Sequence, residues 1–154
     1  MIIDAYDKKI SNICDLVHNK CIVCGASNPR GLHLKFEVAG DGSVKADFQC
    51  DGSFEGYSGS LHGGVIMSIF DGAMGHCMFA RGQTAVTVEM TTRFRQPILT
   101  GRDATVSAHI TRVSHPLYLL KAEIIQDGRV KATADGKFYD QPKLADETEQ
   151  FNER

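Results

Sequence analysis

The sequence lacks three features that mark nucleic-acid-binding, secreted and membrane-spanning proteins. Its 17 Lys and Arg against 19 Asp and Glu give a formal net charge of -2, so no basic surface for nucleic acid is expected. The first residues mix acidic and basic side chains and carry no signal-peptide pattern. No apolar run reaches the roughly 18 residues of a membrane span. We therefore expect a cytoplasmic protein without nucleic-acid or membrane partners.

The cysteine content indicates the redox compartment, and the length indicates the number of domains. Five cysteines, an odd number, without a signal peptide favour free thiols in a reducing compartment. The 154 residues, 42% of them hydrophobic, suit one domain with a proper core. We expect a single domain over 1–154, with a charged, frayed tail over 144–154.

The spacing of apolar residues predicts the order of the elements. Helical spacing predicts an N-terminal helix over 4–18 and a long central helix within 61–80. Between them, alternation over 32–38 and 44–48 around a Gly-Asp-Gly turn predicts a β-hairpin. Further alternating segments follow the central helix, at 86–95, 104–111, 120–124 and from 130 onward.

The first of these later segments is expected to place Val86, Val88, Met90 and Phe94 on one face. Strands joined in hairpins need a cover for one face, and the long apolar helix is the available one. The fold class is therefore α+β, a curved antiparallel β-sheet wrapped around one long central helix.

Asp71 is the one formal charge within 61–80. At 3.6 residues per turn it points away from the apolar stripe, towards Gly64, Ser68 and Gly75. Asp has poor propensity in mid-helix and no capping role there. A hydrogen-bonded structural Asp is the alternative, but the small neighbours indicate that a ligand or a second helix approaches. We interpret Asp71 as functional.

His62, Gly63 and Gly64 open the central helix. The first N–H groups of a helix have no intrahelical partner, and the helix dipole favours negative charge beside them. Such an end can bind a developing oxyanion, although a plain loop-to-helix turn would use the same residues.

Gly63 and Asp71 lie about 12 Å apart along one helix, whereas a general base must come within roughly 3 Å of the reacting atoms. One helix cannot place both groups on one carbonyl. A twofold axis can, because it sets each Gly63 near the Asp71 of the other chain. We therefore expect a homodimer with two equivalent sites.

The segment from Gly59 to Gly64, followed by Asp71, resembles the signature of hotdog-fold acyl-CoA thioesterases of the phenylacetate-pathway type, similar also to 4-hydroxybenzoyl-CoA thioesterases. The residues Cys21–Gly25 and Asn28–Leu32 are similar to the opening of many members. The resemblance implies the hotdog fold and hydrolysis of acyl-CoA thioesters to free acid and CoA, without a metal or organic cofactor. We also expect the homodimers to assemble into a homotetramer, although the sequence leaves dimer versus tetramer open.

By this resemblance, Asp71 is the nucleophile or general base. The amide of Gly63, helped by that of Gly64, polarises the thioester carbonyl at the turn that His62 opens. Thr87 matches a Ser or Thr that orients water in some members.

The chain departs from the family pattern at two places. The loop 54–58 carries no amide side chain where members often have Asn or Gln, and Gly72 stands where many relatives have a second acid. A non-catalytic acyl-CoA binding or sensing protein on the same fold is therefore the alternative function. A hotdog dehydratase is less favoured, because its chemistry uses a His paired with an acid and His62 serves the turn.

Two sets of residues are candidates for substrate binding. CoA carries phosphates, so arginines near the mouth of the site are expected to bind it; they are Arg93, Arg95 and Arg112. Methionines adapt to varied apolar shapes and are candidates for the acyl pocket; they are Met67, Met74 and Met78. The arginines could equally be solvated charges, and the methionines plain core.

The N-terminal part contains Cys14, His18, Cys21 and Cys24, which have the spacing of zinc ligands. However, Cys14 also fits the apolar stripe of the predicted helix, and a single Cys-x-x-Cys pair is weak evidence. The sequence alone therefore predicts no metal, with a structural zinc as the alternative.

Overall fold

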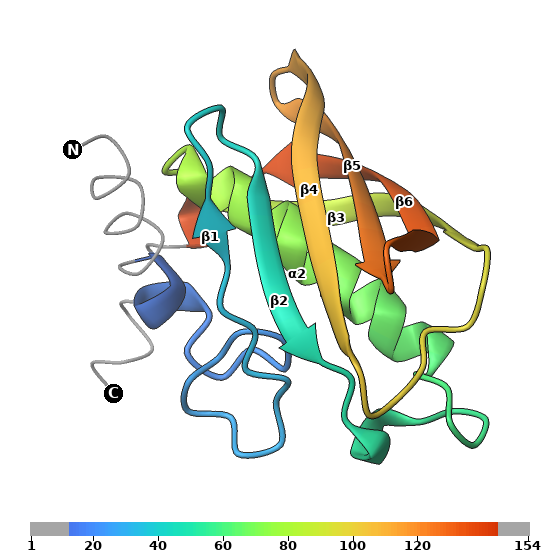
Figure 1. The fold of residues 1–154 in the computed structure, drawn as a ribbon. Helices are drawn as coiled ribbons and strands as arrows, with labels where there is room; N and C mark the ends of the chain where they lie inside the picture. Colours follow the sequence, from blue (N-terminus) through green and yellow to red (C-terminus); the bar gives the residue numbers. More distant parts are fainter. Residues whose placement is uncertain (1–12, 145–154) are drawn as a thin grey trace.

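A computed structural model describes residues 13–144, which form a six-stranded antiparallel sheet around one long helix (Figure 1). The elements in chain order are β1 (Glu37–Val38), β2 (Val44–Gln49), the 3-10 helix η1 (Gly52–Phe54), α2 (Gly63–Ala80), β3 (Ala85–Phe94), β4 (Asp103–Ser114), β5 (Leu117–Gln126) and β6 (Arg129–Asp140). The order across the sheet is β1-β2-β4-β5-β6-β3. The predicted α+β architecture is confirmed.

The two ends of the chain are described in part. Residues 13–17 are helical, whereas 4–12 of the predicted N-terminal helix and 145–154 of the predicted tail lie outside the described residues. Within 13–144, no helix combines the length and the apolar character needed to cross a bilayer.

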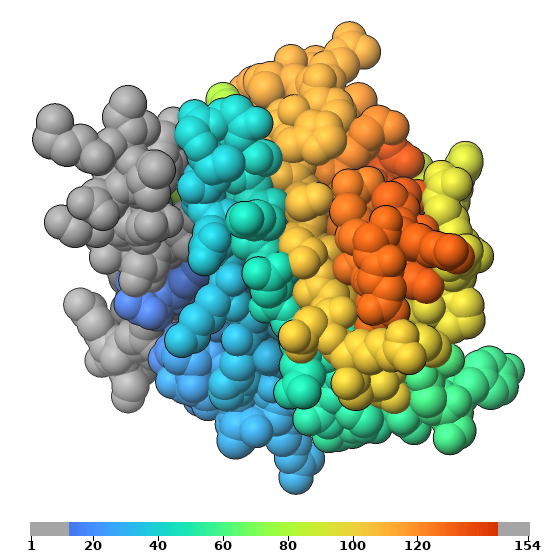
Figure 2. Space-filling model, in the orientation of Figure 1, coloured from blue at the N-terminus to red at the C-terminus, as the bar shows by residue number. Residues whose placement is uncertain are grey.

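The core lies between α2 and the concave face of the sheet. Ile69, Phe70 and Met74 of α2 are fully buried against inward-facing residues such as Val106 and Ile124. Each large side chain buried in this way contributes about 1.5–3 kcal/mol. Seen from the outer face, the strands almost hide the helix (Figure 2). Gly72 and His76, which contact Val23 and Cys14, are buried as well, so α2 is buried on more than one side, as its lack of charge predicts.

The predicted hairpin over 32–38 and 44–48 is wrong in its first half, because β1 begins at Glu37. The N–H groups of Leu32 and Leu34 donate instead to the carbonyls of Ile22 and Val23, at 2.7 and 2.9 Å. The alternation was correct, but Leu32 and Leu34 pair with the loop that carries Cys21 and Cys24, called the cysteine loop below, whereas Glu37 and Val38 pair with β2.

The prediction of one apolar face on β3 is also wrong. A β-bulge shifts the register between Thr87 and Glu89. Every second residue therefore points to one face before the bulge and to the opposite face after it. Val86 and Val88 are 40% and 54% exposed, whereas Met90 packs against the core. The bulge also leaves Thr87 on the helix-facing side, opposite the buried Phe138.

Candidate active site

The start of α2 is capped by its own histidine. His62 has an extended backbone, and its Nδ1 accepts a hydrogen bond from the Gly64 N–H at 2.9 Å. The Gly63 N–H has no hydrogen-bond acceptor among the described residues. In this conformation the His62 cap already uses the Gly64 N–H, which the family resemblance implied as a second donor. The Gly63 N–H is left to polarise a carbonyl.

A cleft of about 410 Å³ opens at this end of the helix, between Gly63 and the loop that carries Gly56 and Tyr57. Phe94 at the end of β3 forms part of the surroundings: its ring lies 3.6 Å from the position of a Cβ built on Gly63. Sequence analysis missed this residue, since the alternation of β3 placed it in the core. Its ring is partly open to solvent instead, at 54% exposure for the residue.

Asp71 is exposed on α2, and its carboxylate accepts a hydrogen bond from the Thr87 hydroxyl. No ion pair neutralises Asp71 within residues 13–144. The contact leaves the second carboxylate oxygen free for a water molecule or a substrate. The structure thus brings together two of the residues that sequence analysis singled out, 16 positions apart in the chain.

Gly63 and Asp71 are not brought together within one chain. Both lie on the continuous helix α2, so about 12 Å of helix axis separates them. The exposed side of α2 around Asp71 carries small residues, including Gly64 and Ser68. At Gly75 an added Cβ would meet no atom within 4 Å. This side of the helix is therefore open to close approach.

Packing explains why position 72, the second departure from the family pattern, is a glycine. A Cβ built on Gly72 would lie 2.5 Å from Cγ1 of Val23, in the cysteine loop. The Gly72 carbonyl also contacts Nδ1 of His76 at 2.7 Å. The loop therefore occupies the space that a side chain at this position would need, directly beside Asp71.

We expect Gly72→Ala to lower the free energy of unfolding by about 1–3 kcal/mol, because the methyl group overpacks against Val23. Urea denaturation measures this loss. In a Val23→Ala background, the same substitution should cost much less, because the clashing methyl groups are gone. An equal cost in both backgrounds would contradict this packing explanation.

The three candidate methionines occupy different environments. Met74 and Met78 are fully buried in the core, whereas Met67 is 40% exposed on α2. In this conformation, Met67 alone of the three is open to an acyl chain. Met74 and Met78 are core residues, which was the alternative interpretation of these methionines.

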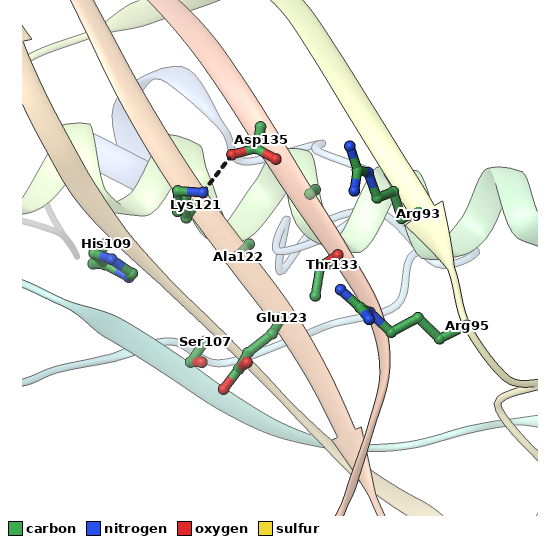
Figure 3. A pocket seen from close by; sticks show the side chains of 10 residues that line it. Arg93, Arg95, Ser107, His109, Lys121, Ala122, Glu123, Thr133 and Asp135 are labelled. Carbon is green, nitrogen blue, oxygen red and sulfur yellow. Dashed lines mark ion pairs between the residues drawn. The ribbon is translucent and has the colours of Figure 1, made fainter.

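Two of the three candidate arginines line one cavity. Arg93 and Arg95 extend from the β3 side over the outer face of the sheet, into a hollow of about 450 Å³ (Figure 3). Lys121 also lines this hollow but is paired with Asp135 at 3.0 Å. Arg112 does not line the hollow. The structure therefore separates Arg112 from the pair that could bind phosphate together.

The loop 54–58 has no Asn or Gln side chain, and its one acidic residue, Glu55, does not take that place in the cleft. The Glu55 carboxylate accepts a hydrogen bond from the Thr100 hydroxyl at 2.8 Å. Tyr57 is 91% exposed and lines the cleft at Gly63. A phenol is thus the polar side chain that this loop presents to the cleft.

Comparisons with known proteins agree with this fold. The Thioesterase superfamily model matches residues 58–141. A solved thioesterase superfamily protein superposes with a TM-score of 0.75 at 24% identity, covering 79% of this chain and 61% of the other. The E. coli PaaI protein from the phenylacetic acid degradation operon superposes with a TM-score of 0.74 at 19% identity, covering 88% and 96%. No curated protein matches the sequence.

A hypothetical thioesterase from Streptococcus pneumoniae, solved with coenzyme A, has a TM-score of 0.67 at 19% identity and covers 71% of this chain and 86% of its own. These structures share the six-stranded sheet and single long helix of the hotdog fold. The chain belongs to the thioesterase superfamily.

Proposed function

We propose that the protein hydrolyses acyl-CoA thioesters to the free acid and CoA. The observation that carries the proposal is the exposed Asp71 carboxylate, held by the Thr87 hydroxyl in a chain of the thioesterase superfamily. The S. pneumoniae thioesterase is described with coenzyme A, and a Streptococcus mutans structure with 16% identity and a TM-score of 0.66 is described with acetyl-CoA. Both support CoA thioesters as the substrate class.

The positions of Asp71 and Thr87 find a parallel in the S. pneumoniae protein. Two further structures of it carry alanine in place of an aspartate and of a threonine, 16 residues apart. Asp71 and Thr87 have the same separation. The parallel supports a joint role for the two residues in this chain.

In the proposed mechanism, Thr87 holds one oxygen of Asp71 and the other oxygen faces the substrate. Asp71 takes a proton from water, and the water oxygen attacks the thioester carbonyl. The Gly63 N–H, at the positive end of α2, stabilises the oxyanion. The C–S bond then breaks, and the CoA thiolate leaves and takes up the proton. Direct attack by Asp71 on the carbonyl, followed by hydrolysis of the anhydride, is the second route open to the same residues.

The site requires a second chain, and β3 is the edge at which we propose that it pairs. Among the described strands, β3 pairs with β6 and leaves its other edge free. Val86, Val88 and Phe94 on this strand are exposed, and a long edge with exposed apolar residues favours pairing with another strand. Antiparallel pairing of two β3 edges would set the open sides of two α2 helices together. Pairing of such dimers into a homotetramer remains a proposal.

We propose that Arg93 and Arg95 bind phosphate groups of CoA. Arg93→Gln with Arg95→Gln should raise KM for acyl-CoA by about tenfold with kcat little changed, because contacts to a remote group act equally on ground and transition states. Steady-state kinetics measure this split. Arg112→Gln is the matched control and should leave KM unchanged. A rise of KM in Arg112→Gln about half as large on a logarithmic scale would show that net charge alone is responsible, because that variant removes one positive charge instead of two.

The test of the proposed function is a panel of short, medium and aromatic acyl-CoAs, followed by release of free thiol. We expect turnover of at least one class. Isothermal titration with the same compounds detects binding without turnover. Binding with no thiol release from any of them would favour the alternative, a non-catalytic acyl-CoA binding protein, which the missing amide in loop 54–58 motivates.

A further inference from the structure

Three thiols and two imidazoles converge beside α2, behind the proposed active site. The potential ligand atoms form two groups that share Cys24: Cys14, Cys24 and His76 in one, and His18, Cys21 and Cys24 in the other. Within each group all these atoms lie within 4.8 Å of one another. Four of the five residues are those of the Cys-His pattern in the sequence, and His76 joins them from the buried side of α2.

The distance between Cys24 and His18 fits a pair of ligands on tetrahedral zinc. Sγ of Cys24 lies 3.6 Å from Nδ1 of His18. With Zn–S near 2.3 Å and Zn–N near 2.0–2.1 Å, a tetrahedral site separates a sulfur ligand from a nitrogen ligand by roughly 3.5 Å. The aromatic ring of Phe79 contacts both imidazoles, with ring centroids 4.8 Å from His18 and 5.2 Å from His76. The imidazole rings are thus held in place by packing.

The turn from Cys21 to Gly25 presents two sulfurs to the same point. The Val23 N–H donates to Sγ of Cys21 at 3.4 Å, and such a bond favours the thiolate over the thiol. The Gly25 N–H donates to the Cys21 carbonyl at 2.9 Å. A Cβ on Gly25 would lie 2.4 Å from the Cys21 nitrogen. The turn is therefore too tight for any residue but glycine.

The electrostatics of the cluster differ from those of the other cysteines. The hydrogen bond from Cys24 lowers the pKa of Cys14 to about 5 and that of Cys21 to about 3, while these same bonds raise the pKa of Cys24. In the apolar core, burial instead raises the pKa of Cys50 to about 11 and of Cys77 to about 12. The difference follows from the mutual contacts of the cluster side chains, whereas desolvation dominates at Cys50 and Cys77.

We propose that His18, Cys21 and Cys24 bind one structural zinc ion and that Cys14 completes the site as the fourth ligand. The two groups meet at Cys24, so Cys14 must move toward His18 and Cys21 when the ion binds. Metal ligation requires thiolates, so any protons on the ligating thiols are released to solvent when the ion binds. His76 supports the site from α2: its Nε2 lies 3.3 Å from Sγ of Cys14, and its Nδ1 contacts the Gly72 carbonyl. The metal joins the loop that carries Cys21 and Cys24 to the helical residues 13–17, and the contact of His76 with Cys14 links this unit to α2 near Gly72.

Elemental analysis of untagged protein, grown with added zinc and purified under reducing conditions without chelator, is expected to give one zinc per chain. Titration of cobalt into the metal-stripped protein should give the intense visible spectrum of a tetrahedral thiolate site. Cys24→Ser and His18→Asn should lose the metal. His76→Asn should keep one metal per chain with affinity lowered about 10–100-fold. Cys50→Ser, a buried thiol outside the cluster, is the matched control and should bind normally.

The cobalt titration uses the unchanged chain, so it is informative even where a variant fails to fold. Absence of both bound zinc and a thiolate–cobalt spectrum would overturn the proposal, as would a Cys21–Cys24 disulfide found under the same reducing conditions. Retention of zinc by His18→Asn together with its loss from His76→Asn would overturn the assignment of His18 as a ligand. None of these measurements depends on thioesterase activity.

Discussion

Asp71→Asn is expected to lower kcat for acyl-CoA hydrolysis on the order of 10²–10⁴-fold, with substrate binding retained. Asn has nearly the same shape and can still accept the hydrogen bond from Thr87, but it can neither take a proton from water nor attack a carbonyl. Thiol release measures kcat, and calorimetry with the same acyl-CoA measures binding.

The chain offers a matched control for this change. Asp47 on β2 also accepts a threonine hydroxyl, from Thr105 at 2.6 Å, on the exposed surface. Asp47→Asn makes the same chemical change in the same kind of pair and should leave kcat unaltered. If Asp71→Asn hydrolyses acyl-CoA as fast as the unmodified protein, then Asp71 has no catalytic role and is a hydrogen-bonded structural residue.

Gly63→Pro is expected to lower kcat by about 10²–10³-fold, because it removes the N–H that we propose stabilises the oxyanion. The fold should tolerate proline there. Proline is favoured at the first position of a helix, and the preceding residue, His62, has the extended backbone that proline requires, with φ -62 and ψ 136. Thermal unfolding followed by circular dichroism verifies that the helix is kept.

Gly63→Ala is the control for this second prediction, because alanine keeps the N–H. Its Cβ would meet the Phe94 ring at 3.6 Å, an ordinary van der Waals contact. Most of the activity should therefore remain. Equal losses in Gly63→Pro and Gly63→Ala would mean that bulk beside Phe94, and not the missing donor, is responsible.

Much of this fold could be predicted from spacing within the sequence. The helical period and the His-Gly-Gly start predicted α2, and the Asp-Gly turn before β6 has the positive φ values, 53° at Asp127 and 74° at Gly128, that a tight hairpin needs. The bulge at Thr87–Glu89 could not be predicted, because it depends on the pairing with β6 and leaves no local signal. The same holds for Leu32 and Leu34, whose backbone partners lie in the cysteine loop.

Some residues of the candidate site could be predicted from side-chain chemistry and helix geometry alone. Asp71 and Thr87 were each singled out from the sequence, but their hydrogen bond was not predicted, because it depends on the bulge that turns Thr87 toward the helix. The engagement of the Gly64 N–H could not be foreseen, because it depends on the rotamer of the His62 ring. The role of His76 was missed for a similar reason: on the helix it looks like one more core residue, and its neighbours Cys14 and Gly72 appear with the tertiary structure.

The central claim is that each active site combines Gly63 of one chain with Asp71 of another. Co-expression of an Asp71→Asn chain and a Gly63→Pro chain with different tags, followed by tandem purification, isolates the mixed dimer. Each parent homodimer is expected to be nearly inactive, whereas the mixed dimer regenerates one complete site and should show about half the specific activity of the unmodified dimer. A mixed dimer as inactive as its parents would contradict the claim, because it would mean that both groups serve one chain's own site.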